Sequence, residues 1–112
     1  MSSIMALTSA AGRGIYSGTK AALVGTTRAQ AIELGPHGVT VNCLAPGPIA
    51  TDMLITMLTP EQRAGFSDRA SLKRLGETTE MVGPALLLSS DAGSYITGSV
   101  LVVDGGVICR SF

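Results

Sequence analysis

The sequence predicts an α/β domain, because strand-like apolar runs alternate with longer segments of helical character. The predicted order is strand, helix, strand, helices, strand. The last run, residues 99–103, is continuously apolar, which is typical of a parallel strand covered on both faces.

The first predicted elements are a strand at residues 3–5 and a helix at residues 16–34, separated by a glycine-containing loop. Gly35 ends the helix as a C-cap, and a proline follows it. His37, the single histidine, lies in the next turn, where we expect a solvated side chain. Small residues that permit close helix approach recur along the helix: Ala21, Ala22, Gly25, Ala29 and Ala31.

A second strand is predicted at residues 39–45, and it stops at Pro46 because proline cannot continue a ladder. Asn42 lies inside this apolar run and is expected to bond the backbone. Apolar residues then recur at helical spacing in residues 51–69, with a new helix start at Pro60.

A final helix is predicted at about residues 80–88, ahead of the last strand. The cap-like sequence Thr78-Thr79-Glu80 marks its start. We assign three charged residues before it to the solvated surface: Lys73, Arg74 and Glu77.

Tyr16 and Lys20 are four residues apart on the long predicted helix, so they share one face about a turn apart. A tyrosine phenol ordinarily has a pKa of about 10, and a neighbouring cation favours the phenolate. The pair is therefore suited to moving a proton near neutral pH. Taken alone, the same spacing more often reflects a half-buried tyrosine beside a solvated lysine.

Three further motifs accompany Tyr16 and Lys20. Ser3 stands thirteen positions before Tyr16, an Asn-x-x-x-Pro-Gly-x-x-x-Thr motif begins at Asn42, and Val-Asp-Gly-Gly ends the last strand. With these motifs the sequence resembles the short-chain dehydrogenase/reductase family, from Ser2 to about Gly106. The nearest likeness is to bacterial 3-oxoacyl-carrier-protein reductases and gluconate 5-dehydrogenase-like enzymes. The resemblance implies the last three strands, with flanking helices, of a Rossmann-like doubly wound parallel sheet.

The resemblance also implies a role for each matched residue. Tyr16 would protonate a carbonyl oxygen during reduction, or take the alcohol proton during oxidation. Lys20 would favour its phenolate, and Ser3 would donate to the substrate oxygen. Ser3 also fits a plain loop cap, and Thr51 a plain helix N-cap. Cofactor contacts would come from Tyr16, Lys20, Pro46, Gly47, Ile49 and Thr51, and the resemblance implies no metal.

Members of that family are more than twice this length, so we expect residues 1–112 to form a partial domain. It would hold the catalytic and substrate-binding half and lack the N-terminal dinucleotide-binding half, whose glycine-rich turn has no counterpart here. The choice between NAD and NADP cannot be read. We expect the isolated chain to be poorly stable and inactive, with Met1 an internal methionine of a longer reading frame.

The amino-acid composition argues against two classes of binding partner. Eight basic residues balance eight acidic ones with no basic run, which argues against nucleic acid and anionic membranes. Apolar stretches fall short of the ~18 residues that span a bilayer. Cys43 and Cys109 are isolated thiols without a disulfide or metal-binding pattern, which favours a reducing cytoplasm.

Two functions remain open from the sequence. The first is an NAD(P)-dependent oxidoreductase that interconverts a carbonyl and a secondary alcohol on a small-molecule substrate, acting in a full-length homo-oligomer, a dimer or tetramer. The second is a non-catalytic truncated subunit that assembles with intact relatives through its alanine-rich helix and its Val-Asp-Gly-Gly end.

Overall fold

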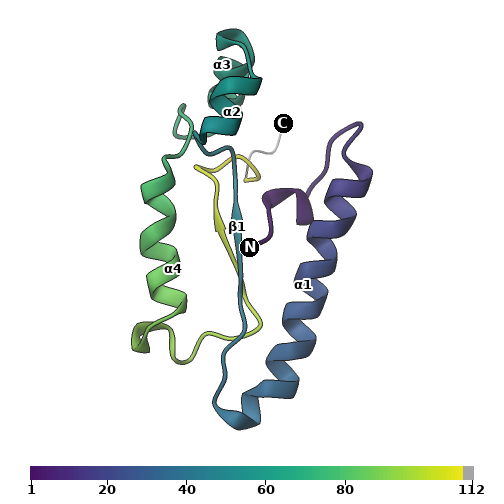
Figure 1. Cartoon of the computed structure of the whole chain (residues 1–112), viewed down its shortest axis with the longest axis vertical. Helices are drawn as coiled ribbons and strands as arrows, with labels where there is room; N and C mark the ends of the chain where they lie inside the picture. Colours follow the sequence, from purple (N-terminus) through teal and green to yellow (C-terminus); the bar gives the residue numbers. More distant parts are fainter. Residues whose placement is uncertain (110–112) are drawn as a thin grey trace.

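The structure, a computed structural model of the chain, describes residues 1–109. Two parallel strands, β1 (Cys43–Pro46) and β2 (Val100–Val103), pair at its centre. The long helix α1 (Gly14–Leu34) lies on one side of the strand pair and α4 (Val82–Leu88) on the other (Figure 1). The α/β class and the parallel pairing are thus confirmed.

The predicted strand at residues 3–5 is wrong, because this segment forms a 3₁₀ helix, η1 (Ile4–Ala6). Among the described residues, the Ser2 N–H donates to the Leu44 carbonyl of β1 at 2.8 Å. The chain then turns away, and the Ser3 hydroxyl oxygen accepts a hydrogen bond from the Met5 N–H at 3.2 Å. A single backbone hydrogen bond does not form a strand ladder. The described part of the chain therefore contains two of the three strands that the sequence predicts.

Helix α1 starts two residues before the predicted position and ends at Leu34 as predicted. Its buried face consists of Val24, Thr27 and Ala31. Gly35 is the C-cap residue of α1, as predicted, and it stays right-handed and opens a further 3₁₀ turn, η2 (Gly35–His37). Gly38 takes the left-handed conformation at φ 74°, which glycine adopts without steric cost. His37 is exposed, as expected.

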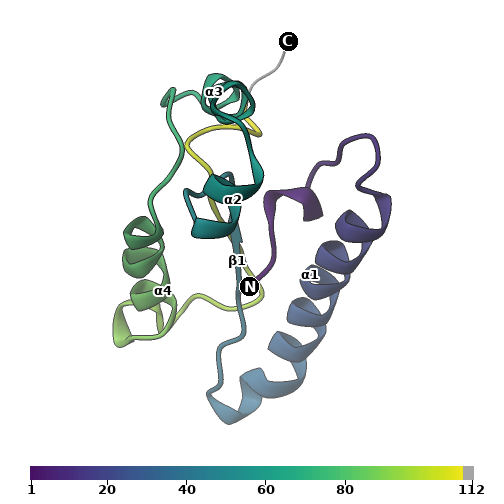
Figure 2. The same cartoon turned by 45° about the horizontal axis from the view of Figure 1, so that its top comes forward.

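Two short helices, α2 (Asp52–Met57) and α3 (Pro60–Arg69), lie over the carboxyl ends of the strands (Figure 2). The Thr51 hydroxyl oxygen accepts a hydrogen bond from the Leu54 N–H at 3.3 Å and caps α2. Thr59 and Gln62 cap α3 reciprocally, side chain to backbone in both directions. The helical character predicted for residues 51–69 is confirmed, and Thr51 is the N-cap of α2.

The last helical region begins with a 3₁₀ turn, η3 (Thr78–Met81), runs into α4, and is followed by η4 (Asp91–Gly93). Beyond it, the Asn42 amide donates to the Ile96 carbonyl at 2.7 Å, and its oxygen accepts from the Ser99 N–H at 3.1 Å. The prediction that Asn42 bonds the backbone is confirmed, and these bonds bring the start of β2 beside β1.

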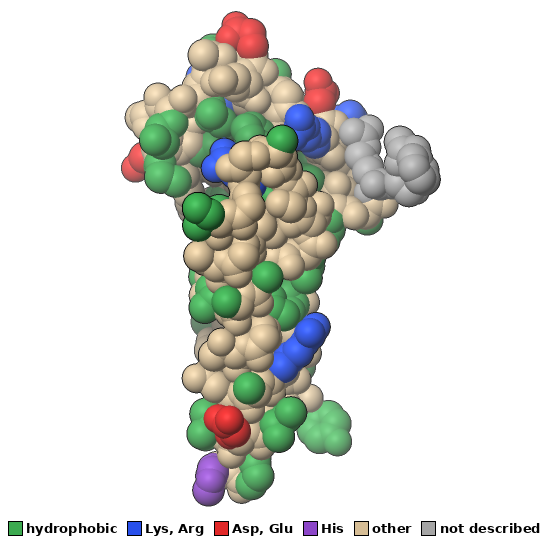
Figure 3. Space-filling model, turned by 90° about the vertical axis from the view of Figure 1, so that its right-hand side faces the viewer, with side chains coloured by type: hydrophobic (Ala, Val, Ile, Leu, Met, Phe, Trp, Pro, Cys, Tyr) green, Lys and Arg blue, Asp and Glu red, His purple; other side chains and the backbone are tan. Residues whose placement is uncertain are grey.

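The core is small and centred on β1, where Cys43, Leu44 and Ala45 are buried. Large apolar side chains on the helices stay open to solvent: Ile15 is 89% exposed, Ile32 78% and Leu86 60%. Figure 3 shows apolar side chains at the surface along the elongated body. Such exposed faces usually pack against another layer. Within residues 1–109, no helix has the length and apolarity needed to cross a bilayer.

Candidate active site

One cleft runs past the carboxyl end of β1 and contains every residue that the sequence marked as catalytic or cofactor-binding. Its larger part, about 550 Å³, is named here the lysine part because Lys20 lines it. Its smaller part, about 360 Å³, is named the arginine part because Arg13 and Arg69 line it. The two parts share six lining residues and are therefore continuous: Ser3, Tyr16, Pro46, Gly47, Pro48 and Leu54. Their volumes are in the range of small-molecule sites.

Tyr16 and Lys20 project from the first two turns of α1 into this cleft. The Lys20 Nζ lies 5.6 Å from the centroid of the Tyr16 ring and donates to the Met1 carbonyl at 3.4 Å. Tyr16 is 44% exposed, and its hydroxyl bonds no other described residue. The phenol is therefore accessible to a ligand and has a cation beside it.

Ser3 reaches the same cleft from the segment before η1. Because its oxygen accepts from the Met5 N–H, its own O–H stays available to donate. Its position is set by Ser2, a buried residue whose hydroxyl donates to the Lys20 carbonyl at 2.9 Å. Ser2 also bonds β1 through its N–H, so it holds Ser3 at a fixed place between the strand and α1. The sequence analysis missed Ser2, whose role depends on contacts with distant residues.

Pro46 and Gly47 form the floor that both parts of the cleft share. The Gly47 N–H donates to the Val103 carbonyl at 2.9 Å, which continues the pairing of β1 with β2. A Cβ on Gly47 would lie 2.6 Å from the Asp104 Cβ and 2.7 Å from the Asp104 Cα. Glycine is needed at this position because the backbone of the next strand end approaches it so closely.

Ile49 and Thr51 line the lysine part on a segment that Gly76 holds in place. The Gly76 N–H donates to the Pro48 carbonyl at 3.0 Å, and the Ala50 N–H donates to the Gly76 carbonyl at 2.8 Å. This pair of bonds forms an isolated parallel bridge between Ile49 and Gly76. The cleft wall therefore depends on a loop that is more than twenty residues further along the chain.

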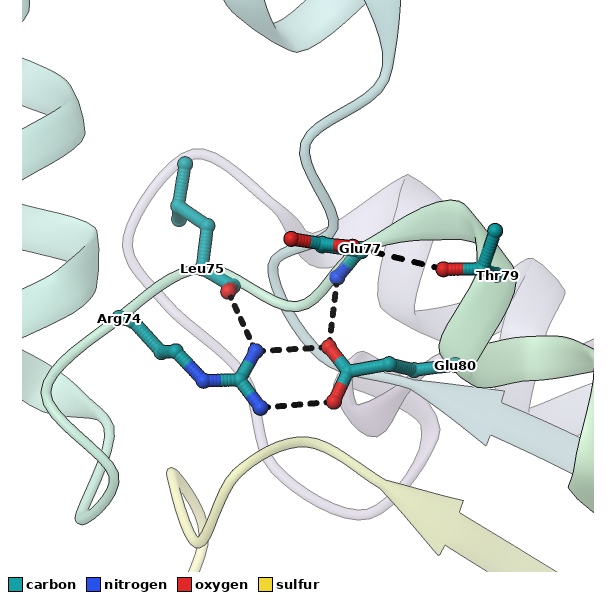
Figure 4. A network of polar contacts seen from close by, with 5 residues as sticks. All are labelled: Arg74, Leu75, Glu77, Thr79 and Glu80. Carbon is teal, nitrogen blue, oxygen red and sulfur yellow. Dashed lines mark hydrogen bonds and ion pairs between the residues drawn. The ribbon is translucent and has the colours of Figure 1, made fainter.

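That loop is held by an ion pair that the sequence analysis missed (Figure 4). The Arg74 guanidinium donates to both carboxylate oxygens of Glu80 at 2.7 Å and to the Leu75 carbonyl at 3.1 Å. The Glu77 N–H also donates to Glu80 at 2.7 Å. Hydrogen bonds from Arg74 and then from Glu77 lower the pKa of Glu80 to about 2. Arg74 is exposed, as expected for a surface residue, and it is also paired.

Among residues 1–109, Arg13, Lys20 and Arg69 line the two parts of the cleft, and no acidic side chain does. Among the described residues, no three His, Cys, Asp or Glu side chains gather where they could hold a metal ion. The lysine part presents the Lys20 ammonium and the hydroxyls of Ser3, Tyr16 and Thr51, groups that could form hydrogen bonds with the oxygen atoms of a ligand.

Comparison with known proteins identifies the family to which the chain belongs. A family profile described as "Enoyl-(Acyl carrier protein) reductase" matches residues 1–108. The chain belongs to the short-chain dehydrogenase/reductase family and corresponds to its C-terminal portion.

Individual relatives include sugar and acyl-carrier-protein enzymes. L-rhamnose 1-dehydrogenase (NAD(P)(+)) of Azotobacter vinelandii is 43% identical over 108 residues, which cover 96% of this chain and 42% of that one. A crystal structure of a candidate gluconate dehydrogenase from Agrobacterium tumefaciens superposes with a TM-score of 0.93 at 32% identity, covering 98% of this chain and 44% of that one.

A 3-oxoacyl-(acyl-carrier protein) reductase from Brucella melitensis, solved with bound NAD, gives a TM-score of 0.84 at 36% identity, covering 95% of this chain and 38% of that one. The chain thus spans less than half the length of the relatives it matches. The likeness to 3-oxoacyl reductases and gluconate dehydrogenases, predicted from the motifs, is confirmed.

Proposed function

We propose that residues 1–112 form the catalytic and substrate-binding part of an NAD(P)-dependent oxidoreductase that interconverts a carbonyl and a secondary alcohol. The observation that carries this proposal is the meeting of Ser3, Tyr16 and Lys20 in one cleft at the carboxyl end of a parallel strand. Ligands of open α/β sheets bind at that end.

The proposed chemistry is a proton transfer handled by the protein. A bound nicotinamide supplies or accepts the hydride. In reduction, the Tyr16 O–H gives its proton to the carbonyl oxygen, and the O–H bond of the new alcohol forms as the phenol becomes phenolate. The Lys20 ammonium beside the ring stabilises that phenolate, and Ser3 donates a hydrogen bond that orients the substrate oxygen.

Two further proposals concern cofactor and assembly. A relative solved with bound NAD and a second whose description includes NAD(P)(+) support a nicotinamide dinucleotide, in either form. The exposed apolar faces of α1 and α4 support burial against further polypeptide, which we propose belongs to a homo-oligomer of the full-length protein. No observation favours the non-catalytic assembly role over this one.

Tyr16→Phe tests the proposal in the protein produced from its complete reading frame. The matched control is Tyr95→Phe, which removes the other tyrosine hydroxyl of the chain from a fully exposed position away from the cleft. We expect Tyr16→Phe to lower NAD(P)H-dependent carbonyl reduction by roughly 10²-fold or more, the usual contribution of a positioned acid, with the fold unchanged by circular dichroism. Normal turnover by Tyr16→Phe would refute the assignment.

A second test uses the 112-residue polypeptide by itself. We expect no measurable NAD(P)H binding by fluorescence titration, because residues 1–109 contain no glycine-rich turn that sets a pyrophosphate against a helix N-terminus. Binding with an ordinary dissociation constant would overturn this expectation.

A further inference from the structure

Two arginines line the arginine part of the cleft together with Tyr16 and Ser3. Arg13 is the N-cap residue of α1, three positions before Tyr16, and Arg69 is the last residue of α3. Both line the arginine part, and both also line an adjoining hollow of about 390 Å³ with Phe66. Resting on the function proposed above, we infer that the substrate carries an anionic oxygen group, a carboxylate or phosphate, which Arg13 and Arg69 bind together.

The charge of the whole cleft supports an anionic substrate. In the part of the chain that the structure describes, no aspartate or glutamate lines the lysine part, the arginine part or the adjoining hollow. Positive charge there is therefore not cancelled by a lining residue. The first turn of α1, beside Arg13, likewise contains no acidic residue. A cleft lined by charge of one sign concentrates counter-ions and attracts an oppositely charged substrate.

The two guanidinium groups also have their donors available. Within residues 1–109, neither the Arg13 nor the Arg69 side chain makes a hydrogen bond or an ion pair. Two other cations, by contrast, have partners: Arg74 is paired with Glu80, and Lys73 lies 3.8 Å from Asp68. Guanidinium groups bind carboxylate and phosphate oxygens through two parallel N–H donors, so two that converge on one cleft suit such a ligand.

Apolar side chains line the arginine part as well. They include Leu54, Met5 and Phe66, which precedes Arg69 by one helical turn. A matching substrate therefore combines three parts: a carbonyl or alcohol at Tyr16 and Ser3, an apolar portion against these side chains, and an anionic group at the arginines. This pattern describes an oxo acid, a hydroxy acid or a phosphate ester, and it disfavours a neutral sugar.

Paired substrates that differ in one charge test the inference. Acetoacetate and levulinate are compared with their methyl esters in NAD(P)H-dependent reduction by the protein from its complete reading frame. We expect the acids to be preferred, and Arg13→Gln or Arg69→Gln to lower kcat/KM for the acids about tenfold while changing that of the esters less than about twofold. Arg28→Gln, on the same helix but outside the cleft, is the matched control and should leave both values unchanged.

A binding measurement keeps this inference separate from the proposed function. Succinate, inorganic phosphate and neutral succinamide are titrated into the 15N-labelled protein while the arginine Nε–H signals are followed by NMR. Binding of succinate or phosphate that is lost in the Arg13→Gln/Arg69→Gln double variant supports the anion site, and the tighter of the two identifies its chemistry. Turnover of esters and acids alike, or the absence of anion binding, overturns it. Failure to reduce any carbonyl, with anion binding intact, counts against the proposed function alone.

Discussion

Gly47→Ala is the sharpest test of how the strand ends build the floor of the cleft. The added methyl group would start 2.6 Å from the Asp104 Cβ, where an ordinary contact is at least 3.4 Å, so the two segments must separate by about 0.8 Å. Asp104 has little freedom to yield, because its carboxylate accepts hydrogen bonds from the Gly106 N–H at 2.8 Å and the Ile108 N–H at 2.9 Å. The Gly47–Val103 bond at 2.9 Å would be strained as well.

Overpacking of this kind costs about 1–3 kcal/mol of unfolding free energy. With a urea m-value of about 1–3 kcal/mol per molar, the midpoint should fall by about 1 M. The matched control is Gly65→Ala inside α3, where a Cβ would meet nothing within 4 Å. That change should stabilise the protein by about 0.5–1 kcal/mol, because alanine loses less backbone entropy than glycine in a helix. The two glycine-to-alanine substitutions should therefore change the unfolding free energy in opposite directions. A urea midpoint for Gly47→Ala at or above that of the wild type would refute the reasoning.

Two further predictions concern the supports of the cleft. Ser2→Ala should lower the unfolding free energy by about 1 kcal/mol, because it removes the buried hydrogen bond to the Lys20 carbonyl. The control Ser94→Ala, at an exposed position, should change the unfolding free energy by less than about 0.5 kcal/mol. Equal urea midpoints for the two variants would contradict this prediction. The pKa of Glu80 is lowered in the fold from 4.5 to about 2, so its contribution to stability is complete above pH 4.5 and is lost as the pH falls towards 2. Glu80→Gln should flatten the stability profile in that window, and an unchanged slope would show that the pair does not stabilise the fold.

The sequence predicted correctly those structural features that depend on residues close together in the chain. The boundaries at Leu34, Thr51 and Thr59 follow from glycine, proline and capping chemistry within a few residues. The parallel pairing of β1 with β2 followed from the apolar character of their runs. The gathering of the marked residues in one cleft followed from the family resemblance together with strand-end geometry.

The features that the sequence did not reveal all depend on long-range contacts. Residues 3–5 have strand-like composition, but a strand also requires a partner along its length, and β1 supplies one bond at Ser2. Arg74 and Glu80 look like ordinary surface charges until the turn between them brings their side chains within 2.7 Å.

The bridge between Gly76 and the segment after β1 has a consequence for how the protein can vary. Because Ala50 and Gly76 are bonded to each other, the chain between them leaves and returns at one point and carries α2 and α3 as a closed excursion. The entropic cost of closing such an excursion grows slowly with its length. Insertions or deletions within this excursion can therefore reshape the wall that holds Phe66 and Arg69 while the bridge keeps the two ends of the excursion together. The helix that carries Phe66 and Arg69 can thus vary separately from α1, which carries Tyr16 and Lys20.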